Sequence, residues 1–202
     1  MEPSKVVQFI NSSLLGLFAL YLLARGDIAW YVIFIPLVSG LKYLFLSQSQ
    51  DKTLDSNQWA HYLAWFLTTP VMLYLIFILN NLSFVDSAIY IVLNQLMIAS
   101  GYIAYQQKSK ESLWNWFTLG CLAFVPIVWQ LVQLEEGIPL ILLTLITWSL
   151  YPIVWYLSYK EEIGIPLRNV AYSSLDFTSK AGLVALYLLE IGKLNLKNFS
   201  FF

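Results

Sequence analysis

Residues 175–182 read LDFTSKAG and stand inside a long apolar stretch. Asp176 and Lys180 are four residues apart, so on a helix they share one face. The apolar sequence continues for about nine residues after Lys180, which keeps its amine from easily reaching a membrane surface. One interpretation is a structural ion pair. The other is a desolvated lysine whose amine forms a Schiff base with a carbonyl compound, with Asp176 as counterion. Ionisable groups this deep in a span favour the second interpretation.

The whole chain is too apolar for a water-soluble domain. Of its 202 residues, 59% are hydrophobic and 11% charged, whereas soluble domains carry about 25% charged residues. The net charge of -1 offers no basic surface for nucleic acid. The single cysteine, Cys121, excludes an internal disulfide, and the single histidine, His61, argues against a histidine-built metal site. We therefore expect an all-α integral membrane protein with no metal and no nucleic-acid partner.

Seven apolar stretches are each long enough to cross a bilayer, which takes roughly 20 helical residues. They run approximately over Val6–Leu23, Ile28–Leu46, Trp59–Leu79, Ser87–Tyr105, Leu113–Leu134, Ile138–Tyr159 and Leu167–Leu189. The connectors are short, so consecutive spans should be antiparallel. This pattern predicts one seven-helix transmembrane domain over residues 1–202. Six spans are the alternative, if Glu135–Gly137 lies inside a helical hairpin.

Basic residues are distributed unequally between the two ends of these seven spans. One side collects Lys5, Lys52, Lys108, Lys110, Lys160 and Arg168, and the other collects Arg25, Lys193 and Lys197. By the tendency of basic loops to remain inside, this count places the N-terminus in the cytoplasm.

The sixth and third spans carry further patterns. Residues 148–155 read WSLYPIVW, in which Trp148, Tyr151 and Trp155 form one aromatic stripe. Pro152 should kink that helix. Residues 61–70 read HYLAWFLTTP. One side of that helix should carry His61, Ala64, Trp65, Thr68 and Thr69. Taken singly, each pattern is equally typical of ordinary membrane-helix packing.

Together these segments resemble the microbial rhodopsins, and the proteorhodopsins among them. The resemblance runs from LKY at residues 41–43 to the end of the seventh span, and includes GY at 101–102 and GCLA at 120–123. It implies a seven-helix bundle that encloses all-trans retinal, bound covalently as a Schiff base to Lys180.

The resemblance also implies a set of residues around the retinal. Trp65 and Trp148 would sandwich the polyene, and Trp155 would add a further wall. Tyr43 and Tyr151 would hydrogen-bond Asp176. Tyr151 also matches a position of the retinal pocket. The remaining matching pocket positions are Thr69, Met97, Gly101, Gly120 and Phe124.

The departures from the family pattern concern proton transfer. Outward proton pumps of this family carry an acceptor carboxylate where this chain has Ala64, and a donor carboxylate where it has Leu75. The family's third-span arginine is His61 here, and Arg168 stands in the proton-release region. Alanine and leucine cannot accept or donate protons. We therefore expect a light-responsive photoreceptor or photoswitch, which is neither an enzyme nor a conventional outward pump.

Lys42 replaces a histidine of the proteorhodopsins and competes with Lys180 for Asp176. Three outcomes are open: a Schiff base without its proton, a neutral Lys42, or a chloride-like anion near Ala64 held by Lys42 and Thr68. The anion outcome supports an alternative function, light-driven inward transport of an anion or a proton. Lys42 can also simply extend toward the surface. His61 is either a proton relay or a packing residue.

The resemblance carries further expectations. Most family members place the N-terminus outside, against the charge count, and we follow the family. Retinal and the lipid bilayer are the expected partners, and a homotrimer or homopentamer is expected by analogy. The expected location is a prokaryotic plasma membrane, with several spans. A third function, scaffolding or binding without a chromophore, also stays open.

Overall fold

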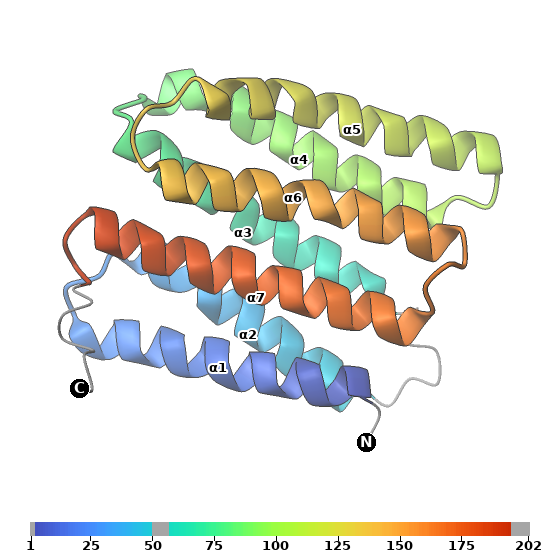
Figure 1. Ribbon diagram of the computed structural model, residues 1–202, viewed down its shortest axis with the longest axis horizontal. Helices are drawn as coiled ribbons and strands as arrows, with labels where there is room; N and C mark the ends of the chain where they lie inside the picture. Colours follow the sequence, from blue (N-terminus) through green and yellow to red (C-terminus); the bar gives the residue numbers. More distant parts are fainter. Residues whose placement is uncertain (1–2, 50–56, 195–202) are drawn as a thin grey trace. The chain divides into compact units, whose positions relative to one another are not determined.

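The computed structural model describes residues 3–49 and 57–194, and within them every regular element is an α-helix (Figure 1). The seven helices are α1 (Pro3–Arg25), α2 (Trp30–Gln48), α3 (Gln58–Leu79), α4 (Phe84–Gln106), α5 (Lys110–Val132), α6 (Ile138–Tyr159) and α7 (Ile165–Glu190). The predicted all-α fold with seven helices is confirmed. Lys52 and Lys197, which entered the charge count, lie outside the described residues.

Six of these helices, α1 to α6, are long and apolar enough to cross a membrane. The seventh, α7, has 26 residues and buries Arg168, Asp176 and Lys180. Large aromatic and aliphatic side chains remain exposed on the helices, among them Leu17 at 64% and Trp129 at 68%. Such exposure suits contact with lipid rather than water. The protein is a multi-pass integral membrane protein.

The residues Glu135–Gly137 connect two separate helices, α5 and α6, each of which is long and apolar enough to cross a membrane by itself. Between them Gly137 has a φ of +69°, in the left-handed region that glycine adopts without steric cost. Directly before this glycine, the backbone N–H groups of Glu135 and Glu136 donate hydrogen bonds to the side-chain oxygen of Asn80, at 3.2 and 2.9 Å. These bonds satisfy backbone groups that a continuous helix would have paired internally.

Several helices begin earlier than their apolar stretches predict, and for α4 and α5 the reason is a serine cap. α4 begins at Phe84 because the Ser83 hydroxyl accepts a hydrogen bond from the backbone of Asp86 at 3.2 Å. α5 likewise begins at Lys110, after Ser109 caps it through the backbone of Ser112 at 3.4 Å. Serine caps favour helix initiation in polar sequence, which a hydropathy reading does not detect.

The chain divides into two compact units. Unit 1 holds α1, α2, α6 and α7, in which α7 packs against both α1 and α6. Asn11 on α1 donates to the carbonyl of Ser173 on α7 at 2.8 Å, and Ser12 donates to the carbonyl of Gly40 on α2 at 3.0 Å. A Cβ on Gly40 would lie 3.2 Å from the nitrogen of Gly16, so small residues let α1 and α2 approach closely. Unit 2 holds α3, α4 and α5, with α4 packed against the other two.

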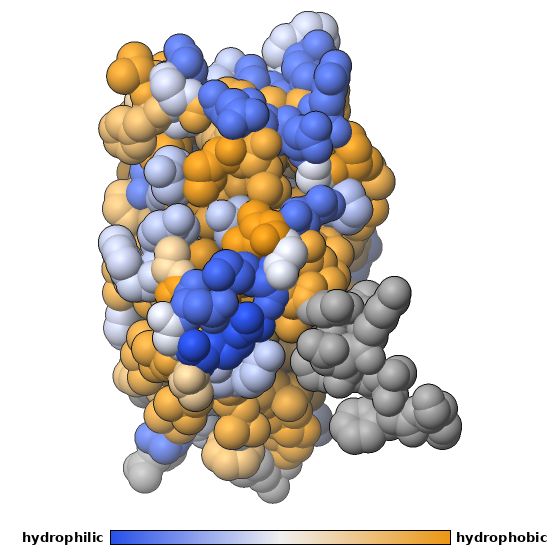
Figure 2. Space-filling view, turned by 90° about the vertical axis from the view of Figure 1, so that its left-hand side faces the viewer, coloured by the Kyte–Doolittle hydropathy of each residue, from blue (hydrophilic) through white to orange (hydrophobic). Residues whose placement is uncertain are grey.

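Unit 1 has an ion cluster at the end where α1 and α7 terminate. Arg25 binds Asp27 through two bonds of 3.1 Å, Lys193 binds the same carboxylate at 3.1 Å, and Arg25 also donates to the carbonyl of Lys193. Figure 2 views this end and shows hydrophilic side chains gathered among hydrophobic ones. The cluster confirms that Arg25 and Lys193 lie on one side, as the count of spans predicted.

The Asp27 cluster should stabilise the fold only above acidic pH. Its hydrogen bond with Lys193, and then that with Arg25, lowers the pKa of Asp27 below its usual value. A lowered folded-state pKa means stabilisation that is complete above the unfolded-state pKa of about 3.9 and lost as the pH falls through the folded value. Asp27→Asn should therefore lower Tm slightly at pH 7 and have no effect in strong acid. Thermal unfolding of both proteins across this pH range tests it, and an equal difference at every pH contradicts it.

Candidate functional site

Asp176 stands at the centre of a buried polar cluster in unit 1. The residue is 0% exposed and lies on α7. Its Oδ1 accepts from the Lys180 amine, one turn along α7, and from the Tyr151 hydroxyl of α6 at 2.6 Å. Its Oδ2 accepts from the Lys42 amine and, at 2.7 Å, from the Tyr43 hydroxyl, both on α2. Four donors from three helices therefore converge on one carboxylate, which has about four acceptor positions.

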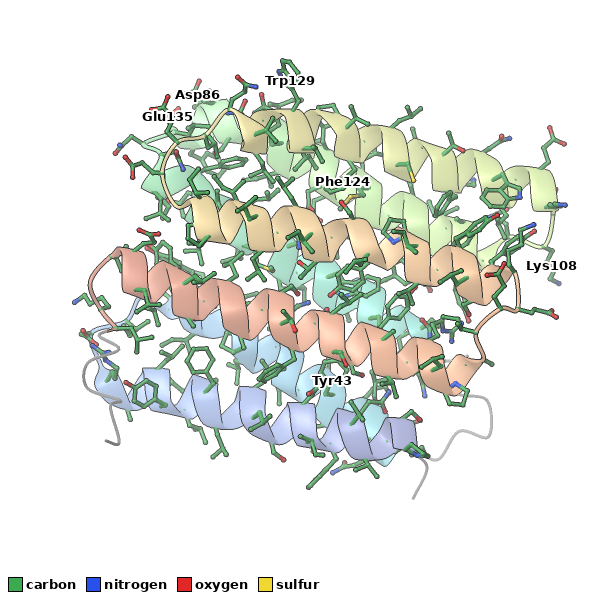
Figure 3. All side chains as sticks on the ribbon, viewed as in Figure 1. Tyr43, Asp86, Lys108, Phe124, Trp129 and Glu135 are labelled. Carbon is green, nitrogen blue, oxygen red and sulfur yellow. The ribbon has the colours of Figure 1, made fainter. Side chains whose placement is uncertain are left out.

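Sequence reasoning named these donors, and the structure shows how each reaches the carboxylate. Lys42 is 6% exposed and Lys180 1%. Lys42 therefore turns inward, and the interpretation that it extends to the surface is wrong. Its nitrogen also lies 3.8 Å from the centre of the Tyr43 ring, a cation–π contact. Tyr43, labelled in Figure 3, supplies both this ring and a hydroxyl to the cluster.

Two residues of the cluster were missed from the sequence. Tyr172, four residues before Asp176 on α7, accepts the Tyr43 hydroxyl at its carbonyl at 3.2 Å. Its ring stacks on that of Tyr151, with centroids 5.8 Å apart. Ser179 lies 3.4 Å from the Tyr151 hydroxyl. The i, i+4 spacing to Asp176 was the signal that placed Tyr172 on this face.

The aromatic stripe predicted on α6 lies in the same unit. Trp148 is 6% exposed, while Tyr151 and Trp155 are partly exposed. Trp155 stacks on Tyr159, with centroids 5.5 Å apart and planes nearly parallel. Tyr151 is thus the residue that links the stripe to Asp176. Pro152 lies within α6, which continues to Tyr159.

In unit 2, Trp65 and Thr69 form a second group of expected retinal contacts. Both are buried on α3, at 7% and 5% exposure. The Trp65 ring meets that of Tyr62 edge to face, with centroids 5.1 Å apart. The Thr69 hydroxyl donates to the Trp65 carbonyl at 2.8 Å and accepts from Asn94 of α4 at 2.7 Å. Asn94 was missed, although an amide inside an apolar span is itself a signal.

The glycines of this second group lie at tight approaches within unit 2. A Cβ on Gly101 would lie 3.1 Å from the Tyr62 ring, and one on Gly120 would lie 3.3 Å from the Met97 carbonyl. At both positions a larger residue would crowd its neighbour, so glycine permits the close packing of these helices. Met97 on α4 and Phe124 on α5 are partly buried, and Figure 3 labels Phe124.

The residues that depart from the pump pattern are also inside. The α3 side chains at these positions are all buried, namely His61, Ala64, Thr68 and Leu75. His61 lies beside Trp65, with ring centroids 5.7 Å apart. The Thr68 hydroxyl donates to the Ala64 carbonyl at 2.7 Å. Neither Ala64 nor Leu75 carries a carboxylate that could accept or donate a proton.

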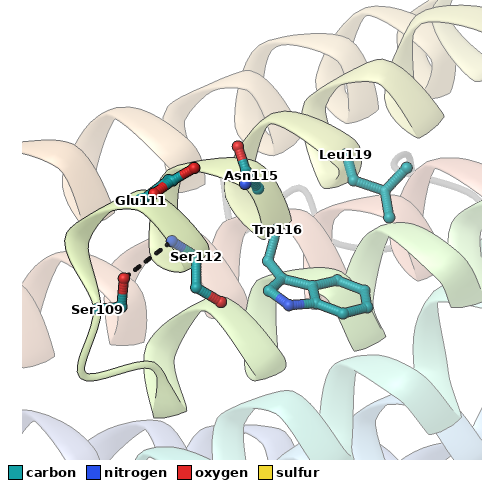
Figure 4. Close-up of a pocket in the computed structure, with 6 residues that line it drawn as sticks. All are labelled: Ser109, Glu111, Ser112, Asn115, Trp116 and Leu119. Atoms are coloured by element: carbon teal, nitrogen blue, oxygen red, sulfur yellow. Dashed lines mark hydrogen bonds between the residues drawn. The ribbon is translucent and has the colours of Figure 1, made fainter.

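A separate hollow lies at the start of α5, lined by Ser109, Glu111, Ser112, Asn115, Trp116 and Leu119 (Figure 4). It contains the Ser109 cap and shares no residue with either group above. No amine lines it, so it cannot form a Schiff base.

The residues present fit a long, apolar aldehyde. An amine almost fully removed from water lies beside a carboxylate in unit 1, and aromatic side chains follow on α6. An amine supplies the covalent attachment, and flat aromatic rings suit a conjugated chain.

The fold and this arrangement define a class, the seven-helix retinal proteins. The profile of the family described as "Bacteriorhodopsin-like protein" matches residues 4–194. The chain therefore belongs to the bacteriorhodopsin-like family. Its members are light-driven pumps or sensors that bind retinal through a Schiff base to lysine.

Individual relatives carry different names. The chain is 27% identical over 162 residues to halorhodopsin from Halorubrum sodomense, covering 71% of this chain and 57% of that protein. It is 24% identical over 140 residues to Opsin-1 from Neurospora crassa, covering 60% and 45%. A third relative, sensory rhodopsin-2 from Natronomonas pharaonis, is 30% identical over 136 residues, covering 60% and 56%. The chain thus spans about half the length of the curated relatives it matches.

Solved structures show the same fold. The proton-pumping rhodopsin AR2 from the alga Acetabularia acetabulum has a TM-score of 0.86 at 19% identity, covering 95% of this chain and 96% of that one. Halorhodopsin, a light-driven chloride pump, has a TM-score of 0.79 at 23% identity, covering 91% and 92%. Identities this low establish the fold and leave the activity to be argued from residues.

Proposed function

We propose that this protein binds all-trans retinal covalently at Lys180, with Asp176 as counterion, and acts as a photoreceptor or photoswitch. The observation that carries the proposal is the buried Lys180–Asp176 pair on α7, held by two tyrosine hydroxyls. When bound there as a Schiff base, retinal supplies light absorption and a light-driven change of shape.

The protein's own residues would hold and orient the ligand. Asp176 would balance positive charge at the Lys180 nitrogen whenever that nitrogen carries a proton, while Tyr43 and Tyr151 keep the carboxylate in place. Ligand contacts are proposed for Trp65, Thr69, Met97, Gly101, Gly120, Phe124, Trp148, Tyr151 and Trp155. The Lys180 side chain is itself only 1% exposed, and this exclusion of water strengthens the electrostatic interaction of its nitrogen with Asp176.

Outward proton pumping is not part of the proposal, because Ala64 and Leu75 offer no titratable group. Illumination of cells that produce the protein with retinal should leave the pH of the medium unchanged. The control is the same cells with a protonophore. Acidification in the light that the protonophore abolishes would contradict the proposal.

Inward transport of an anion or a proton is the second candidate. It is favoured by the surplus of buried amines over carboxylates around Asp176, and by the similarity to halorhodopsins. An anion bound near Lys42 should shift the absorption maximum when chloride is added to salt-free protein. A spectrum independent of chloride removes the anion version, and alkalinisation of the medium in the light would support inward proton transport.

A further inference from the structure

The cluster around Asp176 contains two amines and one carboxylate. Among the residues that the structure describes, Asp176 is the only buried carboxylic acid. Lys42 binds its Oδ2 and Lys180 binds its Oδ1. A single carboxylate can neutralise a single ammonium ion, and a second ammonium without a counterion is strongly unfavourable in a buried site. One of the two amines should therefore be without its extra proton.

The surroundings decide which amine keeps the charge. The Lys42 nitrogen has, besides Asp176, the face of the Tyr43 ring at 3.8 Å, and an aromatic face stabilises an ammonium rather than a neutral amine. The Lys180 nitrogen is the one that a carbonyl ligand would take. Once the ligand is bound, the Lys180 nitrogen is the imine nitrogen of a conjugated Schiff base, which is a weaker base than an alkylamine. The bound ligand therefore favours Lys42 further as the residue that holds the proton.

Further titratable groups of unit 1 lie on the helices packed around the cluster. Tyr43 on α2 and Tyr151 on α6 donate their hydroxyl protons to Asp176 and so stabilise its anion. Tyr172 stacks on Tyr151, and Arg168 lies about two helical turns before Asp176 on α7. On α1 the neighbouring polar group is the uncharged amide of Asn11.

We propose that Lys42 holds the buried positive charge against Asp176, and so keeps the Lys180 nitrogen neutral at neutral pH. Lys42 is thus a positioning residue for Lys180, and this inference rests on the proposed retinal attachment. It has two consequences. A neutral Lys180 amine is the nucleophilic form, so Lys42 promotes ligand uptake. After uptake, the nitrogen carries no proton and the bound retinal absorbs in the near ultraviolet rather than in the visible.

The first test uses the protein without retinal. NMR of 15N-labelled lysine side chains, on protein in lipid nanodiscs at pH 7, should show one of the two buried lysines as ammonium and the other as amine. Lys42→Met should convert Lys180 to the ammonium form. Two ammonium signals in the unaltered protein would overturn the inference, whether or not retinal binds.

The second test uses the protein with retinal. The unaltered protein should absorb in the near ultraviolet at neutral pH and move to the visible on acidification. Lys42→Met should absorb in the visible at neutral pH and take up retinal about tenfold more slowly, as expected for a one-unit rise in the pKa of the attacking amine. Lys42→Arg, which keeps the charge, should match the unaltered protein, as should the exposed-site control Lys160→Met.

A visible band at neutral pH that Lys42→Met leaves unchanged would contradict the role of Lys42. A separate experiment tests the proposed retinal attachment itself. Borohydride reduction of protein incubated with retinal should trap the ligand on the peptide that contains Lys180. The absence of any trapped ligand would reject the attachment itself, while the NMR experiment would still decide the protonation of the two amines.

Discussion

Replacing Lys180 by alanine should leave a folded protein that forms no retinal pigment. The variant removes one of two amines from Asp176, and Lys42 remains to neutralise the carboxylate. The fold therefore keeps a balanced ion pair, whereas the covalent attachment point is lost. Absorption spectroscopy after retinal addition and acidification should show only free retinal, against a visible band in the unaltered protein.

The matched control for this experiment is Lys160→Ala. Lys160 follows α6 within the same unit and is exposed. It should form the pigment to the full extent. Circular dichroism of each variant verifies that the helices are intact. A pigment of normal yield in Lys180→Ala would disprove attachment at this residue, and reduction with borohydride would then identify the amine that replaced it.

Asp176→Asn should destabilise the protein by about 3–5 kcal/mol, the usual cost of leaving a buried charge without its partner. The amide cannot neutralise the buried ammonium of the cluster, and one of its two polar atoms donates rather than accepts. It would therefore oppose the donors that now converge on Oδ1 and Oδ2. Unfolding of the retinal-free protein, followed by helical circular dichroism, measures the loss.

A double variant identifies the cause of that loss. Adding Lys42→Met to Asp176→Asn removes the cation that has lost its carboxylate, so part of the stability should return. The coupling energy between the two sites should fall between about 0.5 and 3 kcal/mol, the range for residues in one buried network. Additive effects of the two substitutions, or a loss below about 0.5 kcal/mol for Asp176→Asn alone, would contradict the shared-carboxylate arrangement.

Much of the fold was predictable because a membrane imposes a simple rule on sequence. Spans need about 20 apolar residues, and this requirement located all seven helices. Their ends were less predictable. Ser83 and Ser109 start α4 and α5 in polar sequence by capping backbone N–H groups, and the break at Gly137 depends on a backbone angle that hydropathy does not report.

The candidate site was predictable where its residues share one helix. Asp176 and Lys180 are one turn apart, so their contact follows from helix geometry alone. Asn94 illustrates the limit. Its bond to Thr69 joins α4 to α3, and it depends on how two helices are rotated and shifted against one another. The pattern of a single span carries no information about that rotation.

The sequence by itself determined the membrane-spanning helical class, the placement of Asp176 and Lys180 on one helix face, and the absence of carboxylates at Ala64 and Leu75. These properties belong to single residues or to one helix, for which local spacing is sufficient. Only the tertiary structure decided that Lys42 turns inward from α2 to share Asp176 with Lys180. Contact between helices is set by packing of whole side-chain faces, and this packing brings two amines to one carboxylate.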